Sequence, residues 1–310
     1  MQAARIRIGT RGSPLAMAQA HEVRDRLVKA HGLSDDAVTI IIIKTTGDQV
    51  LDRPLSEVGG KGLFTKEIEE ALLSREIDLA VHSMKDMQSV LPDGLIVGAV
   101  LPREDPRDAF ISLRHASLSA LPPGAVVGTS SLRRKAQALN ARPDLRVIDF
   151  RGNVQSRLRK LNEGIAEATF LAIAGLKRLG LQDRITAPIS VEDMLPAVAQ
   201  GVISLEIRAD DDATAALIAP LRDEATEVAV TAERAFLARL EGSCRTPIAG
   251  HAVLENSRLS FRGQVLSTDG RKGYDVSRTG APADAHELGT DAADEILSKA
   301  DGAILAHLSA

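Results

Sequence analysis

The sequence predicts an α/β protein with two α/β domains on parallel sheets and a small C-terminal α+β domain with a three-stranded antiparallel sheet. Two patterns support this prediction. Over the first two hundred residues, short apolar runs alternate with amphipathic stretches, which is typical of β-α units whose helices cover a parallel sheet. From Gly250 onward the apolar runs are separated only by turn sequences, as antiparallel strands are.

The first domain is expected to open with a strand over residues 6–8 and a helix over 14–30. Ser13 suits the N-cap of that helix, and Pro14 suits its first position. Residues 38–43 form a continuous run rich in β-branched side chains. Such a run predicts a buried parallel strand.

The β-α pattern then continues, restarts after a linker and gives way to hairpins. Residues 102–108 carry two prolines and five charged side chains, which predicts a linker or hinge. Residues 224–240 predict a helix that leads into the C-terminal domain. The other expected strands are 77–81, 95–101, 125–128, 146–150, 169–173, 251–254, 259–266 and 272–278, and the other helices are 65–75, 132–139, 154–161 and 283–300.

Composition narrows the classes of function. A net charge of −4, one tyrosine and no tryptophan argue against a nucleic-acid partner. No apolar run approaches the roughly 20 residues of a membrane helix, so no membrane partner is expected. A single cysteine and the lack of a signal sequence indicate a cytoplasmic protein. Seven scattered histidines lack the spacing of metal ligands, so no metal is expected.

Basic side chains recur at the starts of helices in four strand-to-helix turns. A cation there opposes the helix dipole by roughly 0.3–1 kcal/mol when exposed, and any one such turn could be ordinary solvated surface. Four of them, each at the carboxyl end of a strand, predict a ligand with several negative groups. Arginine suits carboxylates because its planar fork can bind both oxygens. These cations are Arg11, Arg133, Arg134, Lys135, Arg151, Arg157, Lys177 and Arg178.

Asp86 follows the strand expected over residues 77–81 and lies among these cations. An ionised carboxylate in that setting can stabilise a developing cation or hold an N–H donor; the alternative is an ion pair with Lys85 or a nearby arginine. His82 is interpreted as a packing or positioning residue. The glycine-rich run around Lys61 lacks nucleotide-binding spacing. It is expected to offer Lys61 to an anion, the alternative being a simple turn.

Cys244 is the only cysteine, so it has no partner for an internal disulfide. It follows the helix expected over 224–240, in the loop sequence Gly242-Ser243-Cys244-Arg245. This loop predicts a reachable thiol whose thiolate form Arg245 favours. The alternative is an inert, buried side chain.

Taken together and in this order, these segments resemble the porphobilinogen deaminase family. Each motif is short, but the likeness runs from Arg5 to near the C-terminus, and the ordered combination is specific. The matching stretches are 9–16, 58–64, 80–86, 103–108, 128–134, 151–153, 195–201 and 240–244.

The resemblance implies a transferase that joins four porphobilinogen molecules head to tail into hydroxymethylbilane, releasing ammonia, in the synthesis of haem and related tetrapyrroles. It also implies two domains like type II periplasmic binding proteins and a third domain that carries the cysteine. Porphobilinogen and the growing pyrrole chain are the expected partners, and a monomer is expected. The expected ranges are 1–101 with a return segment at 200–219 for domain 1, 102–199 for domain 2, and 220–310 for domain 3.

The resemblance assigns roles to residues one by one. Cys244 matches the thioether anchor of a dipyrromethane cofactor. Asp86 matches the catalytic aspartate, which would hydrogen-bond pyrrole N–H groups and stabilise the azafulvenium cation left when ammonia departs. Each pyrrole bears an acetate and a propionate, which would explain an arginine-lined site in an acidic protein. The implied cofactor contacts are Ser13, Lys85, Ser131, Arg133, Arg134, Gly152 and Asn153, and the implied substrate contacts are Arg11, Lys61, Arg151, Arg157 and Arg178.

Three positions depart from the family pattern. Glu57 stands where close bacterial relatives often have lysine, which leaves one expected basic contact in doubt or shifts it to Lys61. Gln88 replaces a common proline, and Ala199 replaces a common glycine near the crossover between domains. These changes are expected to affect loop stiffness or the hinge and not the chemistry.

Two other classes of function also agree with part of the pattern. A non-catalytic, two-lobed receptor for a polycarboxylate would explain the alternation of strands and helices and the arginines, but not Cys244 or Asp86. A hydrolase with a cysteine nucleophile would use the thiol, but no histidine lies in a motif that would plainly serve as its base.

Overall fold

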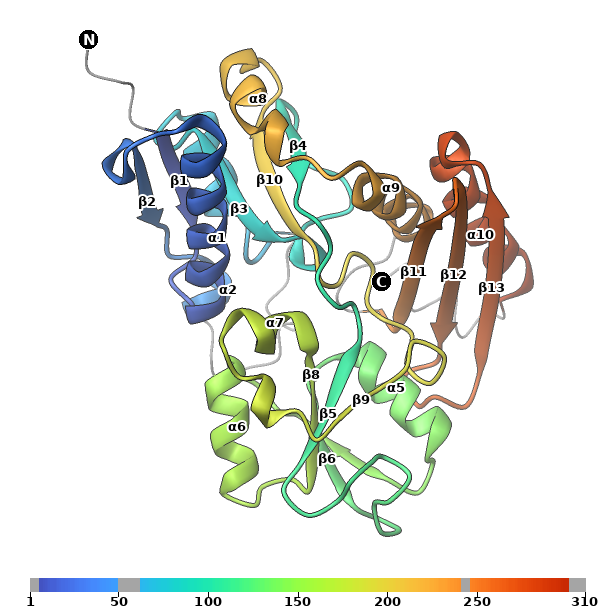
Figure 1. Cartoon of the computed structure of the whole chain (residues 1–310). Helices are drawn as coiled ribbons and strands as arrows, with labels where there is room; N and C mark the ends of the chain where they lie inside the picture. Colours follow the sequence, from blue (N-terminus) through green and yellow to red (C-terminus); the bar gives the residue numbers. More distant parts are fainter. Residues whose placement is uncertain (1–5, 50–61, 241–245, 301–310) are drawn as a thin grey trace. The chain divides into compact units, whose positions relative to one another are not determined.

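The computed structural model describes residues 6–49, 62–240 and 246–300. The chain divides into two compact units, each formed from two separate segments (Figure 1). The first unit comprises Met1–Arg103 and Val202–Glu227, and the second comprises Glu104–Gly201 and Val228–Ala310. In the part of the chain that is described, no helix is long and apolar enough to cross a membrane.

The first unit is built on a five-stranded mixed sheet with the order β2-β1-β3-β10-β4. β1 pairs in parallel with β2 and β3, whereas β10 runs antiparallel to both β3 and β4. The expectation of a purely parallel sheet was therefore wrong, because a strand from a distant part of the chain enters the sheet between β3 and β4. The strands are β1 (Ile6–Thr10), β2 (Val38–Ile42), β3 (Leu79–Ser83), β4 (Leu95–Val100) and β10 (Ile203–Arg208).

Helices cover both faces of this sheet. On one face, α1 (Pro14–His31) packs Val23 and Leu27 into a core with the strands and with α8 (Asp212–Ile218). On the other face, α4 (Lys66–Leu73) packs against β3 and β4. The predicted helix start is confirmed, since the Ser13 side chain accepts a hydrogen bond from the Ala16 N–H at 3.3 Å.

The strand predicted over residues 38–43 is present and parallel, but it was wrong to expect it to be buried. β2 lies at the edge of the sheet, and Ile42 at its end is 55% exposed. A run of β-branched side chains favours a strand without deciding whether that strand is central or at an edge. A short helical turn, α2 (Thr46–Gln49), follows it.

The second unit contains another five-stranded mixed sheet, with the order β7-β6-β8-β5-β9. β6 is parallel to β7 and β8, and β5 is antiparallel to β8 and β9. β5 begins at Asp108, so the end of the predicted linker is in fact the start of a fully buried strand. The strands are β5 (Asp108–Ser112), β6 (Val126–Gly128), β7 (Arg146–Ile148), β8 (Ala168–Ala172) and β9 (Ala187–Pro188), and the helices are α5 (Leu132–Ala141), α6 (Val154–Asn162) and α7 (Ile173–Arg178).

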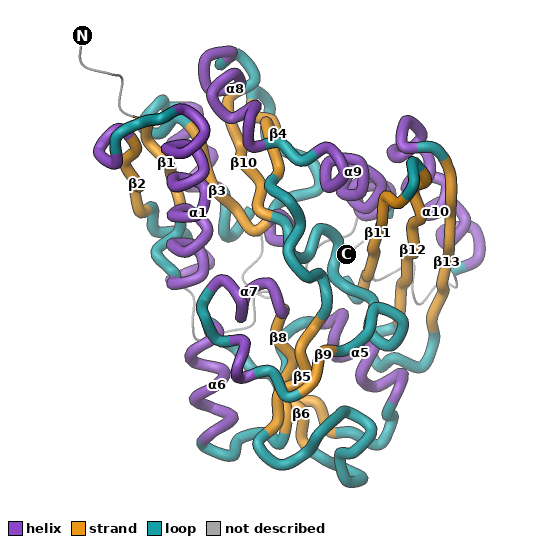
Figure 2. The backbone as a smooth tube through the Cα atoms, viewed as in Figure 1, coloured by secondary structure: helices purple, strands orange, loops and turns teal. Residues whose placement is uncertain are grey.

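The C-terminal region forms the three-stranded antiparallel sheet that the turn pattern predicted (Figure 2). Two helices pack on it, and Phe236 of the first lies 5.1 Å from Phe261, measured between ring centroids. Gly263 leaves room for this contact, because a Cβ there would lie 2.6 Å from the Phe236 ring. With the two mixed sheets, this sheet confirms the predicted fold class. Its elements are β11 (Ile248–Glu255), β12 (Arg258–Leu266), β13 (Gly273–Gly280), α9 (Glu224–Arg239) and α10 (Ala285–Lys299).

The segment before β10 is held in a conformation that favours glycine. Ala199 has a φ of 58°, in the left-handed region. Its N–H donates to the buried Glu233 carboxylate at 2.6 Å, and the next side chain, Gln200, donates to the Pro106 carbonyl at 2.7 Å. These bonds fix the backbone, so the methyl group of Ala199 is accommodated with strain. This position is also the one where the sequence departs from the common glycine.

Ala199→Gly is therefore expected to raise the melting temperature slightly, since relief of a strain of about 1–2 kcal/mol exceeds the entropic cost of glycine, about 0.5–1 kcal/mol. Thermal unfolding followed by circular dichroism measures this. Ala216→Gly, at an exposed position inside α8, is the matched control and is expected to lower stability by about 1 kcal/mol. If both variants lost the same amount of stability, the backbone strain assigned to Ala199 would be contradicted.

Candidate active site

A pocket in the first unit brings together three of the predicted site residues. Arg11, Ser13 and Asp86 line it, along with His82 and Phe64. Arg11 and Ser13 follow β1, and Asp86 follows β3. These strands are parallel neighbours, so their carboxyl ends meet at one edge of the sheet, where α/β proteins bind ligands.

Arg11 and Ser13 form the basic side of this pocket. The guanidinium carbon of Arg11 lies 4.2 Å from the centre of the Phe64 ring, a cation–π contact that places the charge. Ser13 caps α1, whose first N–H groups point out of the helix end. The pocket therefore combines a guanidinium with the positive end of an 18-residue helix, a setting that suits a carboxylate ligand.

Asp86 closes a single 3-10 turn, Met84–Asp86, and is half-buried. The turn is anchored by Met84, which is 3% exposed and donates its N–H to the Val202 carbonyl at 3.0 Å. Lys85 is half-buried beside Asp86. The carboxylate is thus held at the pocket by a turn whose first residue, Met84, is fixed in the core.

Two polar side chains in or next to the pocket, Gln19 and Glu206, were not singled out from the sequence, whereas the burial and hydrogen bond of His82 agree with its interpretation as a packing or positioning residue. Gln19, 3% exposed, lines the pocket and donates from Nε2 to the Ser83 hydroxyl at 2.8 Å. His82 bonds to Glu206, which lies on the strand that the sequence pattern did not predict. A polar residue on the apolar face of α1 was the only signal for Gln19, and no local signal points to Glu206.

A second set of predicted residues lies on the second unit. Ser131 caps α5 and Asn153 caps α6 through side-chain oxygens that accept N–H groups of the first turn. Gly152 has a φ of 116°, and a Cβ there would lie 2.7 Å from the Cβ of Ser156. Both the conformation and the space therefore require glycine in this loop.

Arg133 and Arg134 have partners that the sequence analysis did not foresee. Each is 5% exposed, and each donates from Nη2 to a different oxygen of Asp108 at 2.7 Å. Arg133 also donates to the Leu195 carbonyl at 2.8 Å. Burial alone would raise the pKa of Asp108, but its Coulombic interaction with the two guanidinium groups holds the pKa far below its usual range. Both arginines are thus tied to the protein, whereas the pattern led us to expect them to face a ligand.

Arg151 shares one feature with Arg133. Each has a buried guanidinium nitrogen without a hydrogen-bond partner among the residues that the structure describes, Nη1 in Arg151 and Nε in Arg133. Lys160 donates to the Arg151 carbonyl at 3.0 Å and so holds the loop. A buried guanidinium nitrogen of this kind needs an acceptor, and a ligand carboxylate would supply one.

The other predicted residues are placed as follows. Arg178 donates to the Gly201 carbonyl at 2.9 Å, and Arg157 is half-buried in the first turn of α6. Gln88, one of the departures from the family pattern, lies 3.5 Å from both carboxylate oxygens of Glu69. Cys244, Lys61 and Glu57 lie outside the described residues.

Two family descriptions match the chain in order. Residues 6–216 match "porphobilinogen deaminase, dipyromethane cofactor binding domain", and residues 228–298 match "porphobilinogen deaminase, C-terminal domain". The chain belongs to the porphobilinogen deaminase family. The porphobilinogen deaminase of Paracoccus denitrificans is 60% identical over 295 residues, which cover 95% of this chain and 94% of that one. The chloroplastic enzyme of Pisum sativum is 56% identical over 301 residues, covering 95% of this chain and 82% of that one.

Membership of the porphobilinogen deaminase family confirms the resemblance, the expected enzyme class and dipyrromethane as the cofactor. The receptor and the cysteine hydrolase are no longer supported as alternatives. Among solved structures, the methionine-binding protein MetQ aligns with a TM-score of 0.43 and 14% identity, over 68% of this chain and 85% of that one.

Asp108→Asn is expected to cost about 3–5 kcal/mol in free energy of unfolding, because two buried guanidinium groups lose their counter-charge. The effect should depend on pH. The folded pKa of Asp108 is depressed, so its contribution is fully present above the unfolded value of about 3.9 and is lost as pH falls toward the folded value. Denaturant unfolding between about pH 6 and pH 2 is therefore expected to show a flatter acid dependence in the variant than in the wild type.

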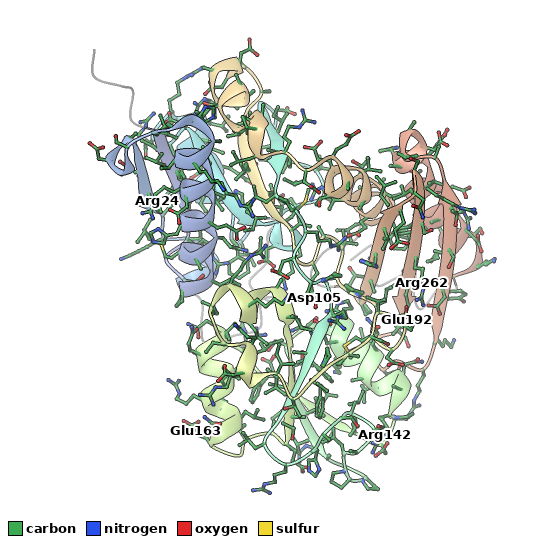
Figure 3. All side chains as sticks on the ribbon, in the orientation of Figure 1. Arg24, Asp105, Arg142, Glu163, Glu192 and Arg262 are labelled. Carbon is green, nitrogen blue, oxygen red and sulfur yellow. The ribbon has the colours of Figure 1, made fainter. Side chains whose placement is uncertain are left out.

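The control is Asp144→Asn, because Asp144 pairs at 2.7 Å with Arg142, which is labelled in Figure 3, and lies on the surface of the same unit. This hydrogen-bonded pair lowers the pKa of Asp144 to about 2, but solvent screens the interaction. If Asp144→Asn lost as much free energy of unfolding as Asp108→Asn, burial would not be what makes the Asp108 ion pairs important for stability.

Proposed function

We propose that the Asp86 pocket is where this porphobilinogen deaminase condenses its substrate, joining four porphobilinogen molecules head to tail into hydroxymethylbilane with release of ammonia. The observation that carries the proposal is the half-buried carboxylate in a pocket that also holds Arg11 and the N-terminus of α1. A pyrrole with an acetate, a propionate and an N–H group offers the groups that such a pocket binds.

The residues present fit a dipyrromethane with its several carboxylates. The buried, unpartnered Nη1 of Arg151 and the capped N-termini of α5 and α6 are suited to anions. When bound, the dipyrromethane supplies the reactive pyrrole carbon to which the first substrate unit is added. The residues proposed to contact it are Cys244, through a thioether, with Ser13, Lys85, Ser131, Arg133, Gly152 and Asn153. Arg134, whose guanidinium nitrogens all bond to Asp108 or to the Phe170 carbonyl, is proposed to keep Asp108 and Arg133 in place for the cofactor.

Asp86 is proposed to act on the substrate in two ways. Its carboxylate accepts a hydrogen bond from the pyrrole N–H, which orients the ring. When ammonia leaves, the ring becomes an azafulvenium cation, and the fixed negative charge of Asp86 stabilises it more than the neutral substrate. Because the turn that carries Asp86 is anchored in the core by Met84, little reorganisation is needed as the charge develops.

The basic residues are proposed to bind the carboxylates of the substrate and the growing chain. Arg11 is held beside Phe64, so its guanidinium is placed before a ligand arrives. A net charge of −4 would repel a polycarboxylate, and a local cluster of arginines overcomes that repulsion. The proposed substrate contacts are Arg11, Lys61, Arg151, Arg157 and Arg178.

We further propose three domains, with residues 1–101 and 200–219 in the first, 102–199 in the second and 220–310 in the third. The strands of the three sheets fall within these ranges, with β10 in the first. We also propose that the protein works as a monomer in the cytoplasm, without nucleic-acid partners. The single cysteine and the acidic, aromatic-poor composition support this.

The mass of the intact protein tests the cofactor and its anchor. The wild-type chain is expected to be heavier than its sequence by two condensed pyrrole rings, and Cys244→Ser to have the unmodified mass. Incubation with porphobilinogen before the measurement would load any protein purified without the group. A wild-type chain still unmodified after that treatment would overturn the proposed attachment.

Asp86→Asn is expected to lower kcat by about 10²-fold or more, because an amide cannot offset the developing positive charge. KM should change far less, since the amide oxygen still accepts the pyrrole N–H. Release of ammonia and formation of hydroxymethylbilane measure both constants. Asp210→Asn, a change at an exposed surface carboxylate, is the control. Full turnover in Asp86→Asn would show that the assigned role is wrong.

A further inference from the structure

A buried acid–base cluster lies behind the Asp86 pocket. His82, on β3, lines the pocket and places its Nε2 atom 2.9 Å from a carboxylate oxygen of Glu206 on β10. The two side chains are 4% and 0% exposed. The other oxygen of Glu206, Oε1, is buried without a hydrogen-bond partner among the described residues. Glu69, on α4, is 4% exposed and interacts electrostatically with both.

The cluster places two buried carboxyl groups beside one imidazole. Burial raises the pKa of Glu69, and the charge of Glu206 raises it further. A buried carboxylate is costly unless hydrogen bonds or a cation balance it, and Oε1 of Glu206 has no hydrogen-bond partner among the described residues. A proton added to the imidazole would place a cation beside the other oxygen of Glu206, 2.9 Å away. The geometry therefore suits His82 to accept a proton from the side of the pocket.

Packing alone does not require this arrangement. An apolar pair of similar volume would fill the same space at no electrostatic cost. A metal site does not explain it either, because no group of three acidic, histidine or cysteine side chains in the described parts of the chain is arranged to hold a metal ion. A carboxylate that orients an imidazole is instead a common arrangement for general bases.

Building on the proposed function, we propose that His82, oriented and charge-balanced by Glu206, accepts the proton that each condensation releases. The new C–C bond joins the free α-carbon of a substrate-derived pyrrole to the methylene carbon from which ammonia has left. The C–H bond at that α-carbon then breaks, its electron pair restores the aromatic ring, and the proton passes to Nδ1 of His82. Nε2–H continues to donate to Glu206, so the imidazolium forms beside a carboxylate, and the proton later leaves to ammonia or water.

Under this proposal Asp86 and His82 have different roles in the reaction. Asp86 keeps its negative charge throughout and stabilises the cation, and His82 moves the proton. The charged groups that interact with the imidazole are Glu206 from β10 and Glu69 from α4, and Asp86 after β3 and Arg11 after β1 line the same pocket. Glu206 is a positioning residue, because it acts through His82 and is fully buried.

The test compares the wild type with His82→Gln and Glu206→Gln, using porphobilinogen with hydrogen or deuterium at its free α-carbon. In His82→Gln, kcat is expected to fall by about 10²-fold or more, with a primary deuterium isotope effect larger than in the wild type, because proton loss becomes the slow step. Glu206→Gln should show a smaller fall, and the acidic limb of its kcat–pH profile should move to lower pH, since an imidazolium without its carboxylate gives up its proton more readily.

Asp211→Asn is the matched control. Asp211 pairs with the buried Arg208 near the end of β10, away from the residues that line the pocket. Its isotope effect and pH profile should match those of the wild type. Circular dichroism and intact mass, recorded for every variant, check folding and cofactor loading without relying on activity.

Two results would overturn the proposal: an unchanged isotope effect in a folded, loaded His82→Gln protein, or a Glu206→Gln protein whose pH profile does not move. Either would return His82 to a structural role and leave the proposed function intact. Failure of the wild-type chain to consume porphobilinogen would overturn the proposed function first, and this inference with it.

Discussion

The buried ion pairs of Arg133 and Arg134 with Asp108 are the interaction on which much of the second unit depends. They join the first residue of β5 to the first turn of α5, and Gln200 donates to the same carboxylate at 2.9 Å. Two positive charges and one negative charge are removed from water here, so each member needs the others. The segment that leads to β10 is thereby tied to the sheet.

That network also limits which arginines can serve a ligand. Arg134 is bonded through all three of its guanidinium nitrogens, whereas Nε of Arg133 and Nη1 of Arg151 are buried and lack an acceptor among the described residues. The helix caps add to this division, because Ser13, Ser131 and Asn153 each satisfy one N–H and leave other first-turn N–H groups directed outward. The proposed anion binding therefore depends on a few guanidinium groups together with helix ends.

The Asp86 pocket is lined by charged side chains, and a buried acid–base pair, His82 with Glu206, adjoins it. Arg11 supplies positive charge where carboxylates would bind, and His82, hydrogen-bonded to the buried Glu206, forms part of the pocket lining. The proposed reaction forms a cation and then releases a proton. The charged side chains of the pocket would act at the first step and the His82–Glu206 pair at the second. The antiparallel strand β10 is what allows them to coexist, because it places Glu206 next to β3.

The sequence by itself determined the local elements and the chemistry of the ligand. Ser13 with Pro14 marks the start of α1, the turns after residue 250 mark the hairpins, and arginines at the carboxyl ends of strands indicate a polycarboxylate. The family resemblance implied that residues 200–219 return to domain 1, but only the tertiary structure decided that β10 runs antiparallel between β3 and β4 and that Arg133 and Arg134 meet Asp108. Caps and turns depend on neighbours within a few residues, so they can be recognised in a sequence. Strand insertion and buried ion pairs depend on partners about 25 to 125 residues away, whose pairing is settled only when the whole core packs.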